Sequence, residues 1–109
     1  MGFTKVCADG DLDAGAMGAF SVDGWEVIVL RDRLGALHAL DGICPHEEYP
    51  LAFGSFDGRI LTCAGHRWTF DTVTGRGIDP PNCRIAKYAV KVEDDEIYVD
   101  RDREPDAAS

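Results

Sequence analysis

Short runs of apolar and β-branched residues, separated by turn-forming residues, dominate the pattern along the chain. Runs of this kind predict β-strands. We predict strands at residues 25–30, 36–40, 58–62, 67–70, 88–92 and 96–99. Helical periodicity is weak, with one short turn expected within residues 9–17, capped by Asp9 or Asp11. Many short strands with frequent turns predict an all-β domain.

The residues between these strands are typical of turns and surfaces. Residues 32–35 are expected to turn the chain between the first two strands, and the acidic run 93–96 is interpreted as a solvated hairpin turn. Trp25 and Phe20 are interpreted as core residues because large aromatic side chains dominate small cores. His38 lies inside a strand pattern and is expected to be a surface or hydrogen-bonded residue, not a metal ligand.

Length and charge narrow the class of protein. The 109 residues suffice for one domain, expected at residues 1–100, followed by a flexible acidic tail at 101–109. Lys and Arg number 11 against 20 Asp and Glu, a net charge of -9, which disfavours nucleic acid and anionic membranes as partners. There is no apolar run of the roughly 20 residues that a membrane helix needs and no secretory signal, so we expect a cytoplasmic protein.

Four cysteines could form two disulfides, but a cytosolic chain more often keeps its thiols reduced or bound to metal. They are Cys7, Cys44, Cys63 and Cys83. Cys7 and Cys83 have no partner nearby in the sequence, and we interpret both as free thiols packed in the interior. The other two each precede a histidine by two or three residues.

The pairs Cys44-Pro45-His46 and Cys63-Ala64-Gly65-His66 are the strongest chemical signal. Two thiolates and two imidazoles on facing loops can hold one metal centre, and soft thiolates favour zinc or iron–sulfur. One interpretation is a zinc-stabilised interaction module, although zinc sites more often begin with Cys-x₂-Cys. The other is a [2Fe–2S] cluster with two cysteines on one iron and two histidines on the other.

The chain resembles a Rieske-type ferredoxin over nearly its whole length. The resemblance is carried by residues 44–46, 63–66 and 68–70 and by a proline-containing segment at 75–81. It implies small antiparallel sheets with the [2Fe–2S] cluster between two loops at one tip. It also implies that Cys44 and Cys63 bind the inner iron, whereas His46 and His66 bind the outer iron near solvent.

Respiratory Rieske proteins, which this pattern also resembles, have two further cysteines joined by a disulfide, where this chain has Tyr49 and Gly65. They also place Ser and Tyr hydroxyls near the cluster, where this chain has Trp68 and Phe70. Hydrogen bonds to cluster sulfur stabilise the reduced state. Without these two donors, the potential is expected near the bottom of the Rieske span of roughly -150 to +300 mV.

Residues 44–51, 66–70 and 82–88 resemble the ferredoxin component of toluene monooxygenases. The resemblance implies a soluble monomeric electron carrier, not an enzyme, that passes single electrons from an NADH-dependent flavin reductase to the diiron hydroxylase of an arene or alkene monooxygenase. The alternatives are the ferredoxin of an aromatic ring-hydroxylating dioxygenase and the small Rieske subunit of a nitrite reductase.

A docking face is expected beside the cluster. Glu47 and Glu48 follow His46 directly and are predicted to meet basic patches on partner proteins, because opposite charges raise the rate of association. The surrounding residues of this predicted face are Tyr49, Pro50, Arg67, Trp68 and Pro81.

Overall fold

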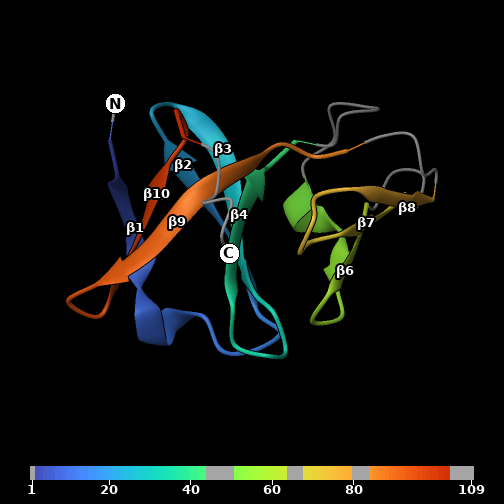
Figure 1. Ribbon diagram of the computed structural model, residues 1–109, viewed down its shortest axis with the longest axis horizontal. Coiled ribbons are helices and arrows are strands. Elements are labelled where there is room, and N and C mark those ends of the chain that lie inside the picture. The colour runs from blue at the N-terminus through green and yellow to red at the C-terminus, as the bar shows by residue number, and fades with distance from the viewer. Residues whose placement is uncertain (1, 44–50, 64–67, 80–83, 104–109) are drawn as a thin grey trace.

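Two antiparallel sheets make up the computed structural model, which describes residues 2–43, 51–63, 68–79 and 84–103 (Figure 1). The larger sheet, called the base here, has the strand order β1-β10-β9-β4-β3-β2. Its strands are β1 (Thr4–Ala8), β2 (Met17–Val22), β3 (Trp25–Arg31), β4 (Leu37–Asp41), β9 (Lys87–Glu93) and β10 (Glu96–Asp100).

The smaller sheet is inserted between β4 and β9 of the base and has the order β5-β6-β7-β8. Its strands are β5 (Ser55–Phe56), β6 (Ile60–Thr62), β7 (Thr69–Asp71) and β8 (Gly77–Asp79). Two 3-10 turns, η1 (Asp9–Asp11) and η2 (Leu51–Phe53), are the helical elements of the described residues, and neither has the length or apolarity that a membrane crossing needs. The prediction of an all-β domain of antiparallel sheets is confirmed.

Strand β3 is buried on both faces, which explains its unbroken apolar run. Val27 and Val29 point into a core enclosed by the base strands, whereas Ile28 and Leu30 point into a second core shared with the small sheet. Successive side chains of a strand alternate between faces, so one strand can serve two cores. This strand therefore joins the two parts of the molecule.

The acidic hairpin turn is confirmed. Asp94 and Asp95 link β9 to β10 with φ of 52° and 63°, and Glu93 pairs with Glu96 on either side. Two successive positive φ values are the conformation of the tight turns that best match the twist of antiparallel strands. The β2–β3 hairpin uses the same device at Asp23 and Gly24, with φ of 54° and 80°.

Several expectations need correction. The helical turn is confined to η1, and it is capped by the Asp11 carboxylate, which accepts the Ala8 amide, not by an N-cap aspartate. The strand pattern does not predict β1, β2, β5 or β8. The interpretation of Trp25 as core is wrong: its side chain is 44% exposed at the start of β3. Phe20 is partly buried against the base core, as expected.

The chain remains attached to the base beyond residue 100. Arg101–Arg103 form a turn in which the Arg103 carbonyl accepts the Ala89 amide at 2.8 Å. The Arg101 guanidinium lies over the rings of Trp25 and Tyr88 at 5.3 and 5.7 Å. The remainder of the expected tail, residues 104–109, lies outside the described residues.

Candidate metal centre

Most of the predicted site residues fall outside the described part of the chain. These are Cys44, His46, Glu47, Glu48, Tyr49, Pro50, His66, Arg67 and Pro81. The structure does describe Cys63 and Trp68, together with the residues from which all three loops depart. These described residues are the anchors of the three loops.

Cys63 follows β6 directly and is the described member of the predicted ligand set. Its side chain is 1% exposed, it forms no disulfide, and it packs in the core shared by the two sheets, with Leu61 and Phe70 among its neighbours. A buried thiol at a loop end fits a metal ligand, because thiolates bind iron and an apolar surround keeps water away. Within the described ranges, no three His, Cys, Asp or Glu side chains are close enough to share a metal ion. The other three predicted ligands lie outside these ranges.

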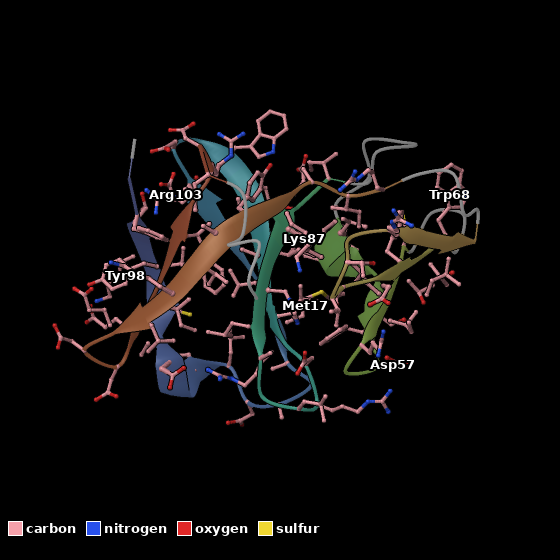
Figure 2. The ribbon with its side chains drawn as sticks, viewed as in Figure 1. Met17, Asp57, Trp68, Lys87, Tyr98 and Arg103 are labelled. Atoms are coloured by element: carbon pink, nitrogen blue, oxygen red, sulfur yellow. The ribbon has the colours of Figure 1, made fainter. Side chains whose placement is uncertain are left out.

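The second ligand loop is closed by a backbone hydrogen bond. The Cys63 amide donates to the Trp68 carbonyl at 2.8 Å, next to the antiparallel pairing of Thr62 with Thr69. The two residues that flank positions 64–67 in the sequence are therefore held together. Trp68 is half-buried and packs against the shared core. Figure 2 places Trp68 and Asp57 at opposite ends of the small sheet, so the loop departs from the end away from the β5–β6 turn.

The first ligand loop departs from the base at the end of β4. The Gly42 carbonyl accepts the Leu51 amide at 2.8 Å, so the residues on either side of positions 43–50 are held together. Asp41 Oδ1 accepts the Ile43 amide at 3.1 Å and the Trp25 Nε1–H at 2.9 Å. A Cβ at Gly42 would lie 2.7 Å from the Glu26 carbonyl oxygen, so this close approach of backbones requires glycine.

The predicted proline loop is anchored in a similar way. The Ile85 amide donates to the Gly75 carbonyl at 2.7 Å, and Arg76 forms an antiparallel bridge with Arg84. These contacts hold the chain on both sides of β8 and of residues 80–83. Each of the three loops thus begins and ends at hydrogen-bonded backbone, which supplies rigid supports for a ligand set.

His38 is hydrogen-bonded, as expected. Its Nε2 lies 2.8 Å from Asp32 Oδ2 and its Nδ1 lies 3.2 Å from Lys87 Nζ, and both His38 and Asp32 are buried. Burial alone would raise the pKa of Asp32, but hydrogen bonds from His38 and from the Ala36 and Leu34 amides outweigh it and lower that pKa. Burial lowers the pKa of Lys87, partly offset by nearby Asp71 and Asp32.

Two further expectations concern single side chains. Phe70 is fully buried and its ring packs in the shared core. Because it is a phenylalanine, this position offers no hydroxyl to a cluster. Cys7 is a free, partly buried thiol, and burial, followed by the charges of Asp11 and Asp9, raises its pKa. Cys83 lies outside the described residues.

Sequence reasoning missed several supports of the site. Gly42 and Asp41 follow an apolar strand directly, and an Asp-Gly pair there is a turn signal that could have marked the first loop's anchor. Lys87 is different: nothing local predicts that its side chain reaches a carbonyl of the small sheet.

Comparison with known proteins identifies the family. A family model described as the Rieske [2Fe-2S] domain matches residues 2–93. The ferredoxin component of the alkene monooxygenase system of Xanthobacter autotrophicus is 37% identical over 89% of this chain and 80% of that protein. The ferredoxin component of biphenyl 2,3-dioxygenase from Rhodococcus jostii is 32% identical over 92% of this chain and 94% of that protein.

A solved structure has a similar fold. A chain in the complex of reduced oxygenase and oxidized ferredoxin of carbazole 1,9a-dioxygenase superposes with a TM-score of 0.80 at 28% identity, covering 89% of this chain and 91% of that chain. Together with the two Cys–His pairs and the buried Cys63 thiol, these similarities decide between the zinc and iron–sulfur interpretations. This chain belongs to the Rieske [2Fe–2S] domain family and is an electron carrier, not a catalyst.

Proposed function

We propose that this Rieske ferredoxin carries single electrons from an NADH-dependent flavin reductase to the diiron hydroxylase of a multicomponent arene or alkene monooxygenase. The observation that carries the proposal is the pair of Cys–His motifs in a Rieske domain, with Cys63 buried at the end of β6. The similarity to the alkene monooxygenase ferredoxin supports the choice of system.

The ligand assignment rests on the family resemblance and fits the donor chemistry. As in the family that the chain resembles, Cys44 and Cys63 would hold one iron and His46 and His66 the other, and mixed Cys and His ligation is the mark of this cluster type. The bound cluster supplies one-electron redox chemistry. The apolar residues around Cys63 exclude water from its sulfur, and the hydrogen-bonded loop anchors hold the backbone rigid.

Transfer requires weak and fast docking. One ferredoxin visit delivers one electron, whereas oxygen activation needs two, so the complex must form and dissociate repeatedly. Small transient interfaces suit this task. Glu47 and Glu48 meet basic residues of the partner, with Tyr49, Pro50, Arg67, Trp68 and Pro81 around them. The carrier acts as a monomer in the cytoplasm.

A second candidate is the ferredoxin of an aromatic ring-hydroxylating dioxygenase. It is favoured by the similarity to the biphenyl dioxygenase ferredoxin and to a chain of the carbazole dioxygenase complex. The two candidates share the cluster and the electron-transfer role and differ in the oxygenase that accepts the electron.

An anaerobic redox titration with low-temperature EPR tests the metal centre. We expect a rhombic signal of the reduced protein and a midpoint potential near the bottom of the range of roughly -150 to +300 mV. Stoichiometric zinc without an EPR signal would overturn the electron-transfer role, and a potential well above zero would contradict the inference from Trp68 and Phe70.

Reconstituted turnover tests the partner. The purified chain is combined with a flavin reductase and either a diiron alkene hydroxylase or a dioxygenase terminal oxygenase, and NADH oxidation and product are measured together. Coupled product formation only with the dioxygenase would select the second candidate.

The docking face is tested by charge reversal. We expect Glu47→Lys with Glu48→Lys to slow turnover at low salt and to weaken its salt dependence. The matched control is the same reversal at Asp13 and Glu93, which are exposed on the base. Equal effects of the two double variants would argue against a local docking face.

A further inference from the structure

The two sheets carry different parts of the proposed ligand set. The first ligand loop departs from the base at Gly42, whereas the second departs from the small sheet at Cys63 and returns at Trp68. The relative placement of the two Cys–His pairs therefore depends on how the small sheet sits on the base. Any contact that sets this placement bears on the geometry of the metal centre.

Polar contacts hold the small sheet to the base at the end opposite Trp68. The Arg33 amide, in the β3–β4 turn, donates to the Gly58 carbonyl in the β5–β6 turn at 2.9 Å. The Lys87 ammonium, at the start of β9, donates to the Val73 carbonyl in the β7–β8 turn at 2.5 Å. Figure 2 shows Lys87 between the two sheets.

Lys87 is itself held in place by the base. Its Nζ lies 3.2 Å from His38 Nδ1 on β4, and His38 Nε2 lies 2.8 Å from Asp32 Oδ2. An ammonium group only donates hydrogen bonds, so Nδ1 accepts and Nε2–H donates to the carboxylate. The second oxygen of Asp32 accepts the Leu34 and Ala36 amides. The hydrogen bonds from Asp32 to His38 and from His38 to Lys87 thus hold the ammonium group so that it points toward the small sheet.

The β7–β8 turn packs closely on the Lys87 side chain. Gly75 has φ of +77°, and a Cβ there would lie 2.7 Å from the Ile85 carbonyl oxygen and 3.1 Å from Lys87 Cγ. The glycine therefore allows an approach that any side chain would prevent. Lys87 contacts the turn both through its stem and through its charged end.

We propose that Lys87 is a positioning residue for the metal centre: it ties the Val73 turn of the small sheet to His38 of the base and so sets where Cys63 lies relative to Gly42, the anchors of the two ligand loops. This inference rests on the proposed function through the ligand assignment. The ammonium group also places a positive charge between the sheets, which favours the more negative reduced state of the protein.

Lys87→Met tests the inference because it keeps an unbranched side chain while removing the charge and the hydrogen bonds. We expect EPR g values that differ from those of the wild-type protein and a lower midpoint potential. We also expect hydrogen exchange of the Thr72 and Gly75 amides to be about tenfold faster, as for the loss of a charged hydrogen bond. Lys87→Arg should recover most of each change.

Lys91→Met is the matched control. Lys91 lies four residues further along β9 and pairs with the Glu93 carboxylate at 3.0 Å. Its ammonium group also lies over the rings of Phe3 and Tyr98, at 4.6 and 5.5 Å, so these contacts all fall at the β1–β10–β9 edge of the base and not on the small sheet. It removes the same charge and should leave the g values and the exchange of the small-sheet amides unchanged. Equal effects of the two methionine variants would overturn the inference, as would wild-type g values and exchange in Lys87→Met.

The result is separable from a failure of the proposed function. If the wild-type protein held no iron–sulfur cluster, the proposed function would fall, yet the exchange of Thr72 and Gly75 would still report whether Lys87 holds the turn. If Lys87→Met did not fold, Lys87→Gln and Lys87→Arg would be compared by the same three measurements, and identical spectra and exchange in both would overturn the inference.

Discussion

The base and the small sheet are built on different scales. Base strands run for five to seven residues, whereas those of the small sheet have two or three. The base encloses a core of its own, including Val27, Ile97 and Val99. The small sheet buries Leu61 and Phe70 in a core that it shares with the base residues Ile28, Leu30 and Leu40. Strands this short rarely form a stable unit alone, so the part that bears Cys63 depends on the base for its stability.

The base has a core of its own, whereas the small sheet carries Cys63 and depends on the base. The β9–β10 turn of the base, far from the small sheet, can change without affecting the ligand loops, whereas a change in the shared core affects the sheet that carries Cys63. The comparison therefore predicts that variants of similar chemistry have different consequences in the two regions.

The largest contrast is expected between the two described cysteines. Cys63→Ser should abolish incorporation of the [2Fe–2S] cluster, because a hydroxyl replaces a thiolate ligand. Cys7→Ser, in strand β1 of the base, should keep full iron content. Iron and sulfide analysis with visible absorption measures both, and a Cys63→Ser protein with wild-type iron would refute the ligand assignment.

A smaller contrast is expected in the cores. Phe70→Ala should cost about 3–5 kcal/mol by leaving a cavity in the shared core, and cluster absorbance should be lost at a lower urea concentration than the base fold. Ile97→Ala, in the base core, should cost about 2–5 kcal/mol and shift both transitions together. Far-ultraviolet circular dichroism and visible absorption follow the two regions; coincident transitions in Phe70→Ala would show that the sheets unfold as one unit.

The buried Asp32 gives the next effect. Because its pKa is lower in the folded than in the unfolded chain, its stabilisation is present above the unfolded value of about 4 and is lost as the pH falls through the folded pKa. Asp32→Asn should therefore lower the free energy of unfolding at pH 7 by about 2 kcal/mol and flatten its decline in acid. Asp13→Asn is the exposed control, and equal acid profiles for Asp32→Asn and wild type would contradict the prediction.

The smallest effect belongs to the β9–β10 turn. Asp95 has φ of 63°, where glycine is less strained, so Asp95→Gly should raise stability by about 0.5 kcal/mol. The turn lies in the base, and the midpoint potential should stay unchanged. Thermal unfolding and redox titration together check this; a changed potential would show that even this turn affects the metal centre.

Local pattern is a good guide where a segment both consists of strong strand formers and has its partner close in sequence. The β9–β10 hairpin follows from alternating apolar residues around an acidic turn, and β3 follows from its β-branched run. Strand β2 was missed because Gly18, Ala19 and Ser21 are weak strand formers; it forms by pairing along its whole length with β3. The Asp23-Gly24 turn was the local signal that could have revealed it.

Trp25 shows where residue type misleads. A large aromatic ring is usually buried, but this one stands at the strand start, where its Nε1–H donates to Asp41 and its face receives Arg101. An indole can satisfy its polar group and cover a cation while staying half-exposed. Arg101 lies far along the chain, so no local pattern predicts the contact.

The sequence by itself determined the chemistry of this protein: two Cys–His pairs in turn-rich β structure predict a Rieske electron carrier, because ligand type and short spacing are local properties. Only the tertiary structure decided that Cys63 is buried between two sheets and that Lys87 ties them together. Strand alternation determines which side chains share a face, but not which distant face they meet. That choice is made when the chain packs, because burial and hydrogen bonding between remote segments are gained only there.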